Sequence, residues 1–274
     1  MSTVADTPIG RGRTSDVFAH GEDRAIKLYP AGESRAAIEQ ECAAAVLVHE
    51  LGVPSVACHG LTERDGRLGI IFERLDGPSL GDLAERDLRA LPSVCRTLAD
   101  LHVQMHSARA AELPDVRELA VGLLDTPALQ GLSAHERSRL TAHVRGLPDG
   151  DSVLHLDFHP QNVFQHKDGY AIIDWHSACR GTPAADVAMS VVLMREVELF
   201  PGTPWPKLLL YSLARRVILH FYLQRYLATT TVTRAEARDW VTCARVLRLG
   251  LLDVASERGR FLRRIRRAAR KARA

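Results

Sequence analysis

The chain has 274 residues, 46% hydrophobic and 25% charged, which is typical of a globular protein with one large core or two lobes. No apolar run approaches the roughly 18 residues that indicate a membrane span, and the first residues lack the pattern of a signal peptide. The five cysteines are scattered and never form a C-x-x-C pair. They argue against a disulfide framework or a zinc site and favour a cytoplasmic location.

Residues 10–29 predict a hairpin followed by a further strand. Gly10 and Gly12 permit a tight turn, and such a turn can lay backbone N–H groups over a polyphosphate, although by itself the pattern favours an ordinary hairpin. Lys27 is a single charge inside the apolar segment AIKLY. The pattern leaves open whether Lys27 faces solvent or contacts a phosphate.

An alanine-rich helix is predicted over residues 34–50, with Ser34 as its cap. Glu39 and Glu41 flank its apolar stripe on opposite sides, so helical periodicity does not decide which of them points inward. Short strands follow, with the Asp-Gly pair at 65–66 as a hairpin turn.

The remainder of the chain is predicted to be mainly helical. The expected helices cover residues 91–109, 133–146, 204–228 and 234–256, and the last opens with a capping-box pair, Thr233 and Glu236. The fold class is therefore α+β, with a small β-rich lobe over 1–75 and a larger helical lobe over 76–256.

The last part, residues 257–274, holds nine Lys/Arg against one acid, whereas residues 77–256 hold 19 against 20. We expect this segment to be a separate basic tail. A solvated end is favoured over an amphipathic helix that contacts a polyanion or a membrane surface.

The segment HLDFHPQN, residues 155–162, places two histidines, an aspartate and an asparagine directly after an apolar strand. These could be loop caps. A zinc site would require a third nitrogen or sulfur ligand in a recognisable pattern, which the sequence does not offer. A second apolar strand ends at Asp174, in the segment IIDW.

The glycine turn, the strand lysine, HLDFHPQN and IIDW together resemble the aminoglycoside phosphotransferase and choline kinase-like family, relatives of the protein kinases. The resemblance covers about residues 8–190 and implies a bilobal protein-kinase-like fold. It also implies ATP and Mg²⁺ as cofactors. Leu156 stands where the family motif, close to H-G-D-x-H-P-x-N, has glycine, so we expect ordinary backbone dihedral angles there.

By this resemblance, Asp157 is the catalytic residue, Asn162 and Asp174 bind the metal, and Asp186 is structural. Lys27 would contact the phosphates and pair with Glu41. The resemblance also implies that Gly10, Gly12 and Ser15 cover the phosphates and that Val17 and Ala25 supply apolar walls. Phe72, Glu73 and Leu75 belong to the implied hinge, whose backbone would bind adenine by hydrogen bonds.

The function implied is ATP-dependent phosphorylation of a hydroxyl on a small molecule, plausibly an antibiotic. The near-zero net charge of residues 77–256 favours a neutral nucleoside-type or glycosylated acceptor. An aminoglycoside phosphotransferase and a metabolic choline or sugar kinase are the alternatives among enzymes. A non-catalytic nucleotide-binding protein with a polyanion-binding tail is the alternative from another class.

Overall fold

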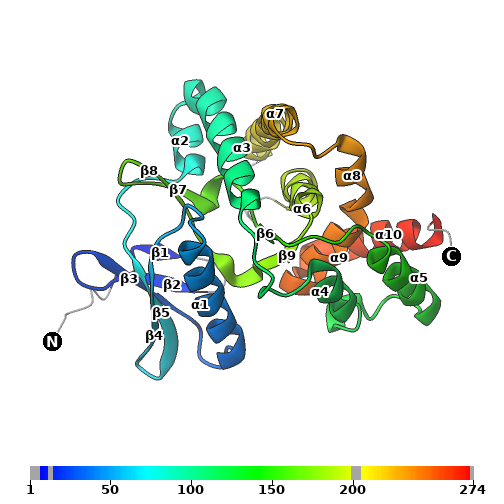
Figure 1. Ribbon diagram of the computed structural model, residues 1–274, viewed down its shortest axis with the longest axis horizontal. Helices are drawn as coiled ribbons and strands as arrows, with labels where there is room; N and C mark the ends of the chain where they lie inside the picture. The colour runs from blue at the N-terminus through cyan, green and yellow to red at the C-terminus, as the bar shows by residue number, and fades with distance from the viewer. Residues whose placement is uncertain (1–6, 12–14, 199–204, 272–274) are drawn as a thin grey trace. The chain divides into compact units, whose positions relative to one another are not determined.

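The computed structural model describes residues 7–11, 15–198 and 205–271, which fall into two compact units (Figure 1). The first unit holds Met1–Arg86 with Pro160–Ala178, and the second holds Asp87–His159 with Cys179–Ala274. This division differs from the predicted lobes of 1–75 and 76–256. The segment after the HLDFHPQN motif joins the first unit because its backbone bonds there: Gln165 N–H donates to the Pro78 carbonyl, and Ile172 N–H to that of Pro54.

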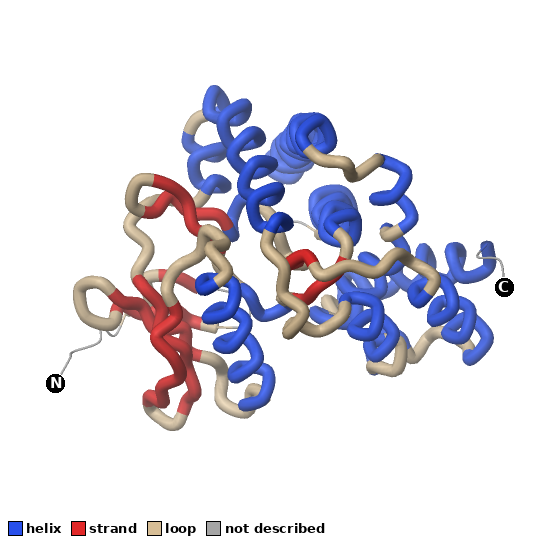
Figure 2. The backbone as a smooth tube through the Cα atoms, in the orientation of Figure 1, coloured by secondary structure: helices blue, strands red, loops and turns tan. Residues whose placement is uncertain are grey.

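A five-stranded antiparallel sheet, ordered β1-β2-β3-β5-β4, forms the base of the first unit (Figure 2). Its strands are β1 Gly10–Arg11, β2 Asp16–Ala19, β3 Arg24–Leu28, β4 Cys58–Arg64 and β5 Arg67–Glu73. The predicted turn between β4 and β5 is confirmed, because Asp65 and Gly66 both have positive φ, 52° and 71°.

The helix α1, Arg35–Glu50, packs on the sheet. It begins where predicted, since the Ser34 side chain accepts a hydrogen bond from the Ala37 N–H. Its inward face, with Ile38 and Cys42, contacts Ile70 of β5. The unit is completed by α2 Leu80–Arg86, the 3₁₀ turns η3 Pro160–Asn162 and η4 Trp175–Ser177, and the hairpin β7 Val163–His166 with β8 Gly169–Ile172.

Helices make up most of the second unit, as predicted. In chain order they are η1 Leu88–Ala90, α3 Leu91–Ser107, α4 Val116–Leu123, η2 Pro127–Leu129, α5 Ala134–Arg145, α6 Pro183–Glu196, α7 Trp205–Thr229, α8 Arg234–Asp239, α9 Val241–Leu252 and α10 Ala255–Lys271. One small strand pair accompanies them, β6 Ser152–Leu154 with β9 Cys179–Gly181. The capping box of Thr233 and Glu236 is confirmed. The predicted helix 234–256 is divided into α8 and α9, and α9 ends at Leu252 because Asp253 adopts a left-handed conformation, with φ 38°.

The basic C-terminal segment is not a solvated end. Within α10, Phe261, Ile265 and Ala269 recur every four residues and are fully buried in the core of the second unit. Several of its arginines pair with acids of that unit, for example Arg264 with Glu196. The expectation of a separate tail is therefore wrong for residues 257–271, because the apolar stripe of the helix completes the core. None of the helices within the described residues is long and apolar enough to cross a membrane.

Candidate active site

One face of the sheet collects the predicted nucleotide-binding side chains. Directly opposed residues of antiparallel strands share a face, and the register pairs Val17 with Lys27 and Ala25 with Phe72. Lys27 and Ala25 are two residues apart on β3, so all four belong to the same face. Gly10 pairs with Val17. Two more predicted residues lie nearby in the chain: Ser15 is buried just before β2, and Gly12 is outside the described residues.

Lys27 lies between two carboxylates. Its Nζ is 2.7 Å from Glu41 Oε1 and 2.7 Å from Asp174 Oδ1. The other oxygen of Glu41 accepts a hydrogen bond from the Tyr29 hydroxyl at 2.7 Å. Glu41 is 3% exposed, while Glu39 is half-exposed in a surface pair with Arg35. The structure thus decides the question that periodicity left open: Glu41 points inward.

The electrostatics of this cluster keep Lys27 and Asp174 charged. Burial by itself would lower the pKa of Lys27, but the carboxylates of Asp174 and Glu41 outweigh it, and the pKa is raised. Burial would likewise raise the pKa of Asp174, yet Lys27 and His176 hold it well below its usual value. Lys27 is therefore a fixed cation beside an ionised Asp174.

Asn162 and Asp174 flank the hairpin of β7 and β8 at the same end. Val163 pairs with Ile172, and Ile173 N–H donates to the Asn162 carbonyl at 3.0 Å. The Asp174 side chain is 32% exposed and therefore accessible to a ligand. A carboxylate and an amide oxygen are hard donors of the kind that Mg²⁺ prefers, so the donor set fits the predicted metal.

The part of the HLDFHPQN loop up to His159 belongs to the second unit. The buried ring of His155 accepts the Asp157 backbone N–H at its Nδ1, at 3.2 Å. The Asp157 carboxylate is 17% exposed and lies 3.5 Å from His159 Nε2. Leu156 has φ 61°, so the expectation of ordinary dihedral angles is wrong. Both His155 N–H and Leu156 N–H donate to Asp186, which holds the turn in this left-handed form.

The hinge segment after β5 has few free backbone donors. Glu73 N–H donates to the Ala57 carbonyl at 2.9 Å, and Arg74 N–H donates to the Asp23 carbonyl at 2.8 Å. The Glu73 carboxylate lies 2.5 Å from Lys167 Nζ, which lowers the pKa of Glu73. The Glu73 side chain is therefore bound within the first unit.

Sequence reasoning did not identify two polar residues of this cluster, Tyr29 and His176. Each stands two residues after a predicted site residue, Tyr29 after Lys27 and His176 after Asp174. The alternation of an extended chain could have indicated Tyr29. His176 lies 3.2 Å from Asp174 Oδ1, and the backbone of Asp174 is left-handed, with φ 71°.

Comparisons with known proteins identify the family and the fold of the chain. The model of the phosphotransferase enzyme family matches residues 6–209. Among solved structures, a thermostable mutant of the aminoglycoside phosphotransferase APH(4)-Ia, in a ternary complex with AMP-PNP and hygromycin B, is similar, with a TM-score of 0.63 and 17% identity. The match covers 97% of this chain and 94% of that one.

Two further solved structures share the fold. A choline/ethanolamine kinase family protein from Mesorhizobium loti has a TM-score of 0.56 and 15% identity, covering 98% of this chain and 87% of that one. The aminoglycoside phosphotransferase APH(3'')-Id from Streptomyces rimosus has a TM-score of 0.53 and 17% identity, covering 88% and 92%. No curated protein sequence matches significantly. The predicted bilobal kinase-like fold is thus confirmed, and the chain belongs to the phosphotransferase enzyme family.

Proposed function

We propose that the protein transfers the terminal phosphate of ATP to a hydroxyl of a small molecule. The observation that supports this most directly is the position of Lys27, a partly buried cation held at 2.7 Å by Glu41 and by Asp174. Phosphoryl transfer depends on positioning and charge compensation more than on covalent chemistry. A lysine fixed beside a part-exposed carboxylate, in a chain of this family, meets that need.

Each residue of the cluster has a distinct task in this proposal. Lys27 binds the α- and β-phosphates, and Glu41 keeps its ammonium group in place. Asp174 and Asn162 hold Mg²⁺ by their side-chain oxygens. The bound metal and nucleotide supply the transferable phosphate and neutralise part of its charge. The face with Val17, Ala25 and Phe72 provides apolar walls for the base, and Leu75 a backbone hydrogen bond.

Asp157 acts on the acceptor. Its carboxylate accepts or orients the proton of the attacking hydroxyl, which makes the oxygen a better nucleophile. The bond from the Asp157 N–H to the His155 ring fixes the backbone of this residue, and the carboxylate itself stays partly exposed for the acceptor.

For the acceptor we propose a neutral or weakly charged molecule, such as a glycosylated or nucleoside-type antibiotic. A site for a polycation needs unpaired carboxylates to compensate its charges. Two acids of the second unit are already paired with arginines, Asp115 with Arg117 and Glu196 with Arg245. Aminoglycosides remain the second candidate, because the solved structure of APH(4)-Ia contains hygromycin B. A side-by-side comparison of kcat/KM on neutral glycosides, nucleoside antibiotics and aminoglycosides distinguishes the two. Highest values for the polycations would overturn the charge argument.

The decisive experiment is a screen for MgATP-dependent phosphorylation followed by Asp157→Ala. We expect the rate to fall by about 10²–10⁴, the usual cost of losing a positioned base, with ATP affinity changed only a few-fold. The exposed Asp151, paired with Arg109 at the surface, provides the control variant Asp151→Ala, which should retain its rate. A chain that binds MgATP and phosphorylates or hydrolyses nothing would instead be the non-catalytic nucleotide-binding protein.

A further inference from the structure

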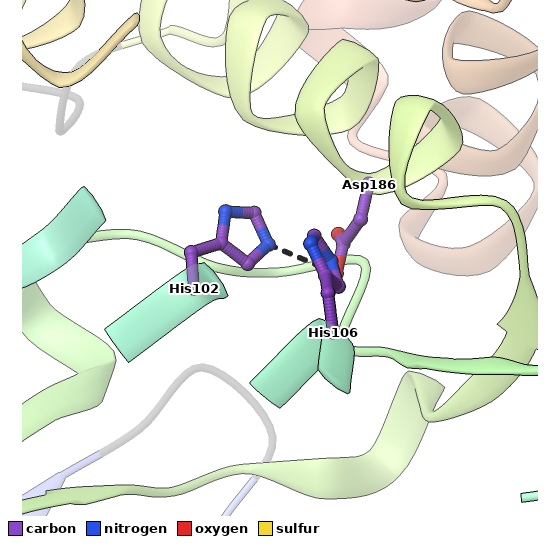
Figure 3. A group of neighbouring side chains, drawn as sticks. All are labelled: His102, His106 and Asp186. Carbon is purple, nitrogen blue, oxygen red and sulfur yellow. Dashed lines mark hydrogen bonds and ion pairs between the residues drawn. The ribbon is translucent and has the colours of Figure 1, made fainter. Parts of the chain in front are cut away.

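Asp186 is a fully buried carboxylate that receives donors from two directions. On one side, the N–H groups of His155 and Leu156 donate to its two oxygens at 2.7 and 3.0 Å. On the other, two histidine rings of α3 point at the same carboxylate (Figure 3). His102 Nε2 and His106 Nε2 lie 3.2 and 3.3 Å from Asp186 Oδ2, and the contact from His106 is the better aligned.

A tyrosine of α7 contacts the other ring nitrogen, Nδ1, of each of these histidines. The Tyr222 hydroxyl lies 2.7 Å from His102 Nδ1, and the Tyr226 hydroxyl lies 2.7 Å from His106 Nδ1. Both pairs are four residues apart on their helices, so they repeat after one helical turn. We call these four residues the histidine–tyrosine cluster. It connects α3 and α7 to Asp186.

The bonding pattern sets the protonation of the cluster. A neutral imidazole has one donor and one acceptor nitrogen. Each tyrosine hydroxyl can donate to Nδ1, which leaves the Nε2–H of each ring for Asp186. Burial, with a contribution from His106, lowers the pKa of His102 to about 3, so His102 is neutral. Burial opposes ionisation of Asp186, but the imidazole rings of His102 and His106 beside it hold the pKa of Asp186 well below its usual value.

A metal ion is the competing explanation, because His102, His106 and Asp186 present ligand atoms within 4.8 Å of one another. Hydrogen bonding accounts for the same geometry more completely. Both oxygens of Asp186 already accept backbone N–H groups, and both Nδ1 atoms have hydroxyl partners. The three residues are at most 5% exposed, so they offer no open position for an exchangeable ligand.

The backbone next to Asp157 explains why such an anchor is needed. Leu156 is a non-glycine residue with φ 61°, a conformation that costs free energy in any residue with a Cβ and persists only where surrounding bonds enforce it. Asp186 is the enforcing group, since its two oxygens accept the backbone N–H groups of the consecutive residues His155 and Leu156.

We propose that His102, His106, Tyr222 and Tyr226 are positioning residues for phosphoryl transfer, which hold the Asp157-bearing loop in its left-handed form by fixing Asp186. The inference rests on the proposed role of Asp157. It predicts that substitutions in the cluster lower the amide protection of residues 155–157 and kcat most when residue 156 has a Cβ.

The test is a cycle that combines His106→Gln with Leu156→Gly or Leu156→Ala. Both substitutions at 156 remove the same buried side chain, and they differ only in the Cβ that makes a left-handed φ costly. The first readout is amide hydrogen exchange of residues 155–157. The second is kcat and KM for MgATP hydrolysis with water as acceptor. Tyr226→Phe, which removes one hydroxyl and keeps the ring, replaces His106→Gln if that variant fails to fold.

In the Leu156→Ala background we expect His106→Gln to lower amide protection and kcat by at least about tenfold, with KM for ATP within about twofold. In the Leu156→Gly background the same change should cost less than about threefold. Equal losses in both backgrounds would overturn the proposal, as would stoichiometric zinc in the purified protein. If no variant hydrolyses ATP, the proposed function fails, while the exchange data still decide the role of the cluster.

Discussion

Asp174 in the first unit and Asp186 in the second are both ionised carboxylates with a depressed pKa, yet their environments are opposite. Asp174 is 32% exposed, and its partners are the charged Lys27 and the imidazole of His176. Asp186 is fully buried, and its partners are backbone N–H groups and two buried histidines. The first arrangement can exchange a partner for an incoming ligand, whereas the second offers nothing to exchange.

The same contrast extends to the two units. Charged residues on the inner face of the sheet unit, such as Lys27 and Glu41, are held in place and remain near an accessible carboxylate. Charged residues buried in the helical unit pair with one another, as Arg248 does with Glu257, both at most 5% exposed. We therefore expect substitutions in the first group to affect ligand binding and those in the second to affect stability.

The largest loss of stability is expected for Asp186→Asn. A neutral amide would place an NH₂ group against N–H donors, and breaking a buried charged network typically costs about 3–5 kcal/mol. Urea denaturation of the parent and the variant measures the change. A loss below about 1 kcal/mol would mean that Asp186 is as replaceable as a surface acid.

A comparable loss is expected at the C-terminal helix. Phe261 of α10 is fully buried, and Phe→Ala in a core costs about 3–5 kcal/mol. Arg263, exposed on the same helix, is the matched control, and Arg263→Ala should change the free energy of unfolding by less than about 0.5 kcal/mol. Equal, small effects at both positions would restore the expectation of a separate, solvated tail.

Asp174→Asn should show the opposite behaviour to Asp186→Asn. We expect the free energy of unfolding to change by less than about 1 kcal/mol, because Lys27 keeps its bond to Glu41. Magnesium-dependent ATP affinity should fall at least about tenfold, since a neutral amide is a poorer ligand for a hard cation. Urea denaturation measures the free energy of unfolding, and titration calorimetry with and without Mg²⁺ measures the ATP affinity. Asn162→Ala should weaken binding less, and a larger effect there would reverse the assigned roles.

The pH dependence of stability offers a further distinction. The pKa of His102 is lowered from 6.5 to about 3 in the folded protein, so the unfolded chain binds a proton more readily. The contribution of the neutral ring is complete above about pH 6.5 and is lost as the pH falls toward 3. We expect His102→Gln to flatten the acid side of the stability profile. If the parent and His102→Gln showed the same slope of unfolding free energy against pH on the acid side, the neutral state of His102 would be contradicted.

The smallest effect is expected at Glu39, whose exposed pair with Arg35 should contribute less than about 0.5 kcal/mol. Glu39→Gln therefore serves as the control for Glu41→Gln, since Glu39 lies two residues before Glu41 on the opposite side of the apolar stripe of the same helix. Only the second variant should weaken MgATP binding, because it releases Lys27 from its buried partner. Equal affinities for the two variants would argue against the proposed phosphate contact.

Local chemistry made a large part of the fold predictable. The Ser34 cap of α1, the Asp-Gly turn at 65–66 and the capping box at Thr233 depend on residues within one turn of each other, and all are present. The motif of 155–162 and the strand ending at Asp174 indicated the family for a related reason, since their residue types reflect chemistry that few other sites require. The sequence by itself therefore determined the fold class, the family and the candidate residues.

The tertiary structure decided what depends on distant partners. Glu41 rather than Glu39 points inward because its carboxylate accepts hydrogen bonds from Lys27 and Tyr29. Leu156 adopts a left-handed conformation because Asp186, thirty residues later in the chain, binds its N–H. The apolar stripe of α10 could have belonged to a free amphipathic helix, and only the core of the second unit shows where it is buried. In each case the deciding free energy comes from burial or hydrogen bonding between segments far apart in sequence, which no local pattern records.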